Sequence, residues 1–197
     1  MSEKVLSKVV RDVLSEQERE RQDTVWREIA SWIGIILVAV AFALLVNRVL
    51  IVNAQVTSGS MKNTIQVGDR VIGLRVTTWF SEPKEGDIVF FLNPDNESEI
   101  YVKRVIGVPG DTIDIRGGTV YRNGVALEEP YLAELPKDRD FGPYEVPEGQ
   151  FFMLGDNRND SLDSRYWAHT FVAKEKILGK AYWIYYPRFE SLYKTTP

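Results

Sequence analysis

The feature that most constrains this chain is an uninterrupted apolar run near its N-terminus. From Ile29 to Val46 the sequence IASWIGIILVAVAFALLV holds no charged side chain. As an α-helix this run extends about 27 Å, close to the roughly 30 Å hydrocarbon core of a bilayer. Trp26 and Trp32 lie where interfacial aromatic residues are expected. The run therefore predicts a single transmembrane anchor, which we place at residues 29–52.

Lysine and arginine are distributed unevenly about the apolar run. Residues 1–28 contain six of them, whereas the twenty residues after Val46 contain only Arg48 and Lys62. The positive-inside rule therefore predicts a cytoplasmic segment at 1–28 and an extracytoplasmic domain at 53–197.

A cleavable signal peptide is the alternative to a retained anchor. Ala41-Phe42-Ala43 has the small-x-small pattern of a cleavage site. This tripeptide lies inside the apolar run, however, whereas a signal peptide has its site after a shorter run of about 7 to 15 residues. We therefore favour a retained anchor.

Composition excludes several kinds of site. The net charge is −4 and no run of Lys or Arg is suited to neutralising phosphates, so we expect no nucleic-acid partner. Because the chain has no cysteine, it can form neither a disulfide nor a thiolate nucleophile. The single histidine, His169, excludes a multi-histidine metal site, and any His-dependent triad would need that residue.

Beyond the apolar run the sequence is typical of a β domain. Short runs rich in Val, Ile, Tyr and Phe are separated by turn residues, and no stretch of twelve residues keeps a helical period. Gly117-Gly118 and Asn123-Gly124 are two-residue hairpin signals. Four prolines among acidic residues predict an irregular surface segment from Leu127 to Gly149, within an inserted lobe at about 108–149. We expect strands at Arg70–Val76, Asp87–Leu92, Ile100–Gly107, Thr112–Arg116, Thr119–Arg122, Phe151–Leu154 and Ala181–Tyr186.

Three segments carry polar residues that do not follow strand alternation. They are Thr57-Ser58-Gly59-Ser60-Met61, Tyr101-Val102-Lys103-Arg104-Val105, and the run from Gly155 to Arg165. Taken singly, they have ordinary interpretations as a turn, an exposed strand edge and a loop with local Asx bonds. Together and in this order, they resemble bacterial type I signal peptidases, the membrane-bound Ser/Lys proteases that remove signal peptides. The resemblance covers Thr57 to Gly68, Gly86 to Phe90, Tyr101 to Asp111 and Gly155 to Trp167.

The resemblance implies a role for each matched residue. Ser60 would be the nucleophile and Lys103 its general base, with Ser161 orienting Lys103. Ser58 and the Ser60 backbone N–H would form the oxyanion hole. The remaining matched residues would form ion pairs that support the loop: Asp156, Arg104, Asp163 and Arg165.

The resemblance also implies a fold and a set of partners. The fold would be mainly β, with an N-terminal transmembrane helix and a mostly antiparallel catalytic domain of the signal-peptidase and self-cleaving-repressor type, carrying a small inserted β lobe. The substrates would be exported preproteins with Ala-x-Ala-like sites, and the other partner would be the lipid of the cytoplasmic membrane. No metal or organic cofactor is needed. A single anchor and a small insertion resemble the compact Gram-positive forms.

The chemistry of lysine makes these roles reasonable. A serine hydroxyl is a weak nucleophile until a base removes its proton, and lysine is a base only when neutral. Lowering the pKa of lysine from about 10.4 to near 7.5 requires roughly 4 kcal/mol, which burial in apolar surroundings can supply. Strand alternation would direct Lys103 and Val105 to one face and Arg104 to the other, which keeps the guanidinium away from the base.

Some residues depart from the family pattern. Asn63 stands where the family usually has proline, and we expect only the turn to change. Ala168-His169-Thr170 replaces the usual glycine and apolar pair, and we expect His169 to be a surface or structural residue. Trp79 and Phe80 have two interpretations, as membrane-interface residues or as core aromatics.

Three other functions compete with a signal peptidase. A related Ser/Lys protease could cleave itself or a regulator, but the anchor and the lack of a DNA-binding module argue against this. An inactive homologue that only binds preproteins would be expected to lack Ser60 or Lys103, and both are present. A tethered structural β domain leaves the combination of motifs without explanation.

Overall fold

The computed structural model describes residues 3–132 and 134–193, and it separates into two units between Val46 and Asn47. The first unit lies within helix α1, Glu3–Leu50. Its Val25–Leu50 portion is long and apolar enough to span a bilayer. Ile51 and Val52, at the end of the predicted anchor, instead begin strand β1 and lie opposite Leu74 and Gly73.

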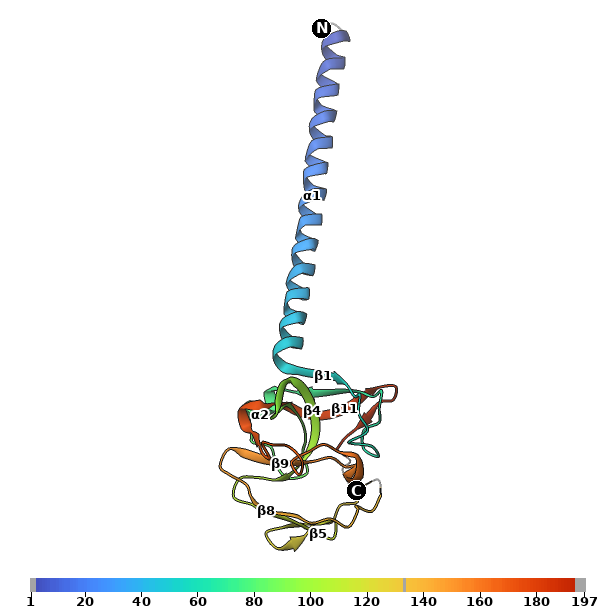
Figure 1. The fold of residues 1–197 in the computed structure, drawn as a ribbon. Helices are drawn as coiled ribbons and strands as arrows, with labels where there is room; N and C mark the ends of the chain where they lie inside the picture. Colours follow the sequence, from blue (N-terminus) through green and yellow to red (C-terminus); the bar gives the residue numbers. More distant parts are fainter. Residues whose placement is uncertain (1–2, 133, 194–197) are drawn as a thin grey trace. The chain divides into compact units, whose positions relative to one another are not determined.

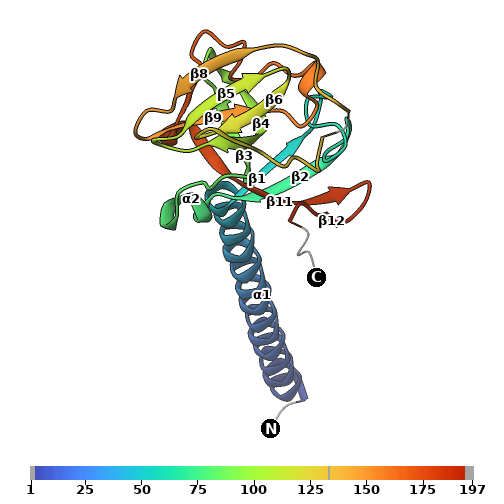
Figure 2. The ribbon, with the colours of Figure 1, turned by 90° about the horizontal axis from the view of Figure 1, so that it is seen from below.

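The second unit is built mainly of antiparallel strands, which confirms the predicted fold class. Its larger sheet has the order β1-β2-β11-β3-β4-β9-β10, with β12 added beside β11. Figure 2 shows β1, β2 and β11 side by side. The bounds are β1 Ile51–Gln55, β2 Arg70–Leu74, β3 Ile88–Asn93, β4 Asn96–Gly107, β9 Gln150–Leu154, β10 Val172–Ala173, β11 Ile177–Tyr186 and β12 Glu190–Ser191.

A smaller sheet of order β7-β6-β5-β8 lies below the larger one in the view of Figure 1. Its strands are β5 Thr112–Arg116, β6 Thr119–Arg122, β7 Val125–Ala126 and β8 Phe141–Glu145. β8 corrects the sequence analysis, which expected an irregular segment there. Pro143 is tolerated because β8 is the edge strand of this sheet, where a missing N–H need not break a ladder.

Within residues 3–132 and 134–193, short helices occupy three connections. They are α2 Val76–Phe80 and the 3₁₀ turns Arg158–Asp160 and Lys174–Lys176. The predicted strand Arg70–Val76 is therefore too long, since β2 ends at Leu74 and α2 begins at Val76.

Buried side chains fix the segments that carry the polar motifs. Met61, directly after Ser60, is fully buried with Ile65, Val71 and Phe90. A second cluster joins the two sheets, because Ile106 of β4 and Phe152 of β9 pack with Ile113 and other residues of the smaller sheet. Both the loop after β1 and the end of β9 are thus held by core packing.

Gly73 in β2 has no room for a side chain. A Cβ placed there would lie 2.6 Å from the Lys180 carbonyl oxygen and 2.9 Å from Phe90 Cε2. We predict that Gly73→Ala destabilises the second unit by about 1–3 kcal/mol, the usual cost of overpacking. The matched control is Gly34→Ala in α1, where nothing lies within 4 Å of the added atom. Melting temperatures in detergent test this, and equal values for both variants would contradict it.

Candidate active site

The structure brings Ser60 and Lys103 together. Ser60 lies in the loop after β1, and Lys103 lies in β4, where it is opposite Val89 of β3. Lys103 Nζ donates a hydrogen bond to Ser60 Oγ. Both residues are buried, with 3% of Lys103 and 6% of Ser60 exposed. The proposed nucleophile and base are therefore in direct contact away from bulk solvent.

Burial changes the protonation of Lys103. Desolvation lowers its pKa from the ordinary value to about 8, while the carboxylates of Asp163, Asp156 and Asp160 oppose the change and Arg165 reinforces it. The Tyr101 ring lies 5.6 Å from Lys103 Nζ. With a pKa near 8, a substantial fraction of Lys103 is neutral at mildly alkaline pH, as a general base requires.

A groove opens over this pair. It has a volume of about 600 Å³, and its lining includes residues 54–60 and 99–103. Ser58 lies in this lining, and its Oγ is 3.4 Å from Ser60 Oγ. The Ser58 hydroxyl is therefore close enough to Ser60 Oγ to reach a carbonyl oxygen that this atom would attack.

Ser161 does not make the contact that the resemblance implied. Its Oγ is buried and has no hydrogen-bond partner among residues 3–132 and 134–193. It lies beside Gly155, where an added Cβ would be 2.3 Å from Ser161 Oγ and 2.4 Å from the Ser60 carbonyl oxygen. In this structure Ser161 therefore packs near Ser60, the proposed nucleophile, without bonding to Lys103.

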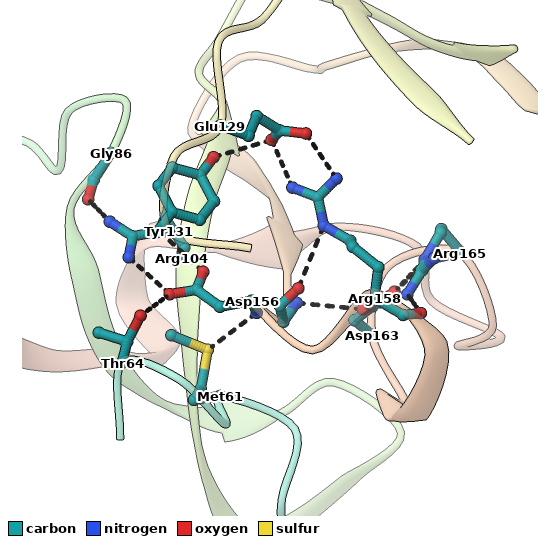
Figure 3. Close-up of polar contacts among 11 residues, drawn as sticks. Met61, Thr64, Gly86, Arg104, Glu129, Tyr131, Asp156, Arg158, Asp163 and Arg165 are labelled. Carbon is teal, nitrogen blue, oxygen red and sulfur yellow. Dashed lines mark hydrogen bonds and ion pairs between the residues drawn. The ribbon is translucent and has the colours of Figure 1, made fainter. Parts of the chain in front are cut away.

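The two implied ion pairs are present (Figure 3). Arg104 Nε and Nη2 donate to Asp156 Oδ1 and Oδ2 at 2.8 and 2.6 Å. Arg165 Nε and Nη2 donate to Asp163 Oδ1 and Oδ2 at 2.8 and 2.9 Å. Asp163 Oδ2 also accepts from the Gly155 N–H at 3.1 Å. Such bidentate pairs fix the orientation of both partners.

Several residues of this network were missed by the sequence analysis. Thr64 Oγ1 donates to Asp156 Oδ2 at 2.5 Å, and Asn157 Nδ2 donates to the Gly59 carbonyl at 3.0 Å. Arg158 forms an ion pair with Glu129, which lies far from it in sequence. Arg158 could have been noted, since it lies within the matched run from Gly155. Nothing in the sequence pointed to Glu129, because it lies in the stretch from Leu127 to Gly149, which contains no recognisable motif.

Asn63 has a more specific role than a change of turn. Its φ is +89°, which proline cannot adopt because its ring fixes φ near −65°. In this conformation Asn63 Nδ2 donates to the carbonyls of Tyr131 and Leu132 at 3.0 and 3.4 Å. The expectation that only the turn would differ is therefore wrong: Asn63 also connects the loop of Ser60 to a distant segment.

His169, Trp79 and Phe80 lie at the surface. His169 Nδ1 is 2.9 Å from Asp95 Oδ1, and the side chain of His169 is 74% exposed. Its backbone N–H also donates to Asp95 Oδ1 at 2.9 Å. Trp79 and Phe80 of α2 are 57% and 84% exposed, so the interpretation that they are core aromatics is wrong.

Comparisons with known proteins show which family the chain belongs to. The family described as "Signal peptidase, peptidase S26" matches residues 29–186. A "Probable signal peptidase I-2" from Synechocystis is 35% identical over 184 residues, covering 91% of this chain and 81% of the relative. "Signal peptidase I" from Bacillus licheniformis is 37% identical over 173 residues, covering 83% of this chain and 91% of the relative.

A solved structure is also similar in sequence. The crystal structure of a signal peptidase I from Enterococcus faecalis V583 is 38% identical, with a TM-score of 0.45, and covers 51% of this chain and 97% of that one. The resemblance predicted from the polar motifs is thus confirmed by the family match and the relatives. The chain belongs to the signal peptidase family, peptidase S26.

Proposed function

We propose that this chain is a membrane-anchored serine endopeptidase that removes signal peptides from exported preproteins at Ala-x-Ala-like sites. The observation that carries the proposal is the buried contact between Lys103 Nζ and Ser60 Oγ under an open groove. The printed names of the relatives, signal peptidase I, support the same substrate class.

The reaction begins with Lys103 in its neutral form. Its Nζ accepts the Ser60 proton as Oγ attacks the carbonyl carbon of the scissile bond, and a tetrahedral oxyanion forms. The Ser58 hydroxyl and the Ser60 backbone N–H donate to this oxyanion. The Lys103 ammonium then protonates the departing amine, which leaves an ester on Ser60.

Hydrolysis of the ester returns the enzyme to its starting state. Neutral Lys103 takes a proton from water, and the resulting hydroxide attacks the ester carbonyl. The same donors stabilise the second oxyanion. When it collapses, Ser60 leaves with the proton held by Lys103, and the cleaved signal peptide departs with a free carboxylate.

The groove is suited to an extended peptide. β1 is the terminal strand of the larger sheet, and residues 54–60, which begin within β1, line the groove. An extended segment can bind such a strand through main-chain hydrogen bonds, with alternate side chains entering pockets. We therefore place the residues before the scissile bond along residues 54–60.

The anchor sets the proposed location. The excess of Lys and Arg before the span supports a cytoplasmic N-terminus and an extracytoplasmic catalytic unit. The Arg75 N–H donates to the Leu50 carbonyl at 2.8 Å, so the residue preceding α2 lies beside the last residue of the candidate span. Trp79 and Phe80 of α2 are exposed aromatic residues of the kind enriched at membrane interfaces, and their proposed role is to contact lipid there.

Removing either member of the pair should abolish cleavage. Lys103→Met keeps a long apolar side chain in the buried site but removes the base, and Ser60→Ala removes the nucleophile. We expect each to lower the rate by at least about 10³-fold for cleavage of an Ala-x-Ala preprotein in detergent. The control is Lys62→Met, which removes an exposed amine near Ser60. Cleavage by both site variants at the parent rate would refute the assignment.

The pH dependence should follow Lys103. Because its pKa is about 8 and the neutral form is active, the rate should rise with pH through a midpoint near that value. Asp160 raises this pKa, so Asp160→Asn should move the midpoint to lower pH. Glu148→Gln, which removes the same charge from an exposed residue, serves as the control. A midpoint that rises in Asp160→Asn, or that moves equally in both variants, would count against the model of a lysine base.

A further inference from the structure

Residues 127–132, which connect β7 toward β8 and are here called the strap, contact the loop that follows β9. Glu129 Oε2 accepts from Arg158 Nη1 at 2.8 Å, and Glu129 Oε1 accepts from Arg158 Nη2. The two side chains are 6% and 2% exposed. A buried bidentate pair of this kind is costly to break from one side, because it leaves an unpaired charge.

Tyr131 contacts both the Glu129 carboxylate and a second arginine, Arg104. Its hydroxyl donates to Glu129 Oε1 at 2.8 Å, and the Arg104 guanidinium lies 3.9 Å from the centre of its ring. Burial, with a contribution from the Glu129 carboxylate, raises the pKa of Tyr131, so the hydroxyl keeps its proton. Figure 3 shows Glu129 and Tyr131 facing Arg158 and Arg104.

The two arginines lead to the nucleophile. Arg158 Nε donates to the Gly155 carbonyl at 3.1 Å, and Arg104 binds the carboxylate of the next residue, Asp156. The following N–H, from Asn157, donates to the Ser60 carbonyl at 3.0 Å. The strap therefore holds Gly155 and Asp156 through the two arginines. Gly155 lies beside the Ser60 carbonyl, and Asn157, directly after Asp156, is hydrogen-bonded to it.

The strap is also attached to the Ser60 loop from the other direction. Asn63, three residues after Ser60, donates its side-chain amide to the Tyr131 carbonyl at 3.0 Å. The strap thus contacts both segments that must meet at the nucleophile, the loop after β1 and the loop after β9.

We propose that Glu129 and Tyr131 are positioning residues for Ser60. Through Arg158 and Arg104 they hold in place the loop that contacts the Ser60 backbone. The inference rests on the function proposed above and adds a requirement for the inserted segment. The groove over Ser60 is lined by other described residues, among them 54–60 and 99–103, and the strap is not part of that lining. Its effect should therefore fall on the chemical step rather than on substrate binding.

The test uses the full chain in detergent micelles with an Ala-x-Ala preprotein. Glu129→Gln keeps the shape of the side chain and removes its charge, whereas Tyr131→Phe removes one hydrogen bond. The matched controls are Glu128→Gln, at the exposed neighbour of Glu129, and Tyr121→Phe in β6. kcat and KM are measured per folded molecule, with the folded fraction taken from circular dichroism and thermal melting.

We expect Glu129→Gln to lower kcat about tenfold while KM stays within about twofold, because small displacements of reacting groups affect the chemical step. Tyr131→Phe should have a smaller effect in the same direction. The double variant should be no slower than Glu129→Gln, because the hydroxyl and the charge act through one network. Both controls should match the parent.

Two results would overturn the inference. The first is a melting temperature that falls while kcat per folded molecule stays at the Glu128→Gln value, since this would show a purely structural role. The second applies if Glu129→Gln does not fold: unchanged kcat in both Tyr131→Phe and Asn63→Gly, which keeps a positive φ but removes the amide, would exclude positioning by the strap. A parent rate equal to that of Ser60→Ala would overturn the proposed function itself, and this inference with it.

Discussion

The proposed active site depends on burying one lysine. An ammonium group in apolar surroundings is strongly disfavoured, so the surrounding β strands make Lys103 easier to deprotonate, to a pKa of about 8. In the proposed mechanism, that single effect lets Lys103 activate Ser60 without histidine. It also constrains the rest of the site, because carboxylates too close to Lys103 would restore its charge. Asp156 and Asp163, the two carboxylates that oppose the shift most, are each bound by an arginine.

The ion pairs therefore have two consequences. Arg165 partly offsets the effect of the carboxylates on Lys103, and both pairs shape the loop that packs on the Ser60 backbone. Gly155 is central to this packing, because both Ser161 Oγ and the Ser60 carbonyl occupy the space that a side chain would fill. The inserted segment reaches the same loop through Glu129 and Tyr131. Core packing of Met61 fixes the chain directly after Ser60.

The sequence predicted the elements whose signals are local. The apolar run, the hairpin turns and the three polar motifs identified the candidate span, most strands and the Ser60–Lys103 pair. β1 was missed because Ile51 and Val52 continue the apolar run, and β8 was missed because Pro143 is acceptable only on an edge strand. Neither strand could be predicted without knowing the order of strands in the sheets.

The unpredicted part of the site comes from contacts between distant segments. Glu129, Tyr131 and Asn63 have no motif in common, and only the folded chain brings them to the catalytic loop. Ser161 shows the opposite limit: its place in a motif implied a bond to Lys103, whereas its hydroxyl is buried beside Gly155 instead. The motif correctly placed Ser161 near Ser60 but did not predict its contacts.

The proposed mechanism requires that burial lower the pKa of Lys103. This ionisation can be measured directly. The chain would be labelled with ¹³C at lysine Cε, and the Lys103 signal would be assigned by its absence in Lys103→Met. Titration of that signal in detergent should give a pKa near 8, well below the ordinary lysine value. A value near the ordinary lysine pKa of about 10.4 would contradict the account, because the general base would then be charged at working pH.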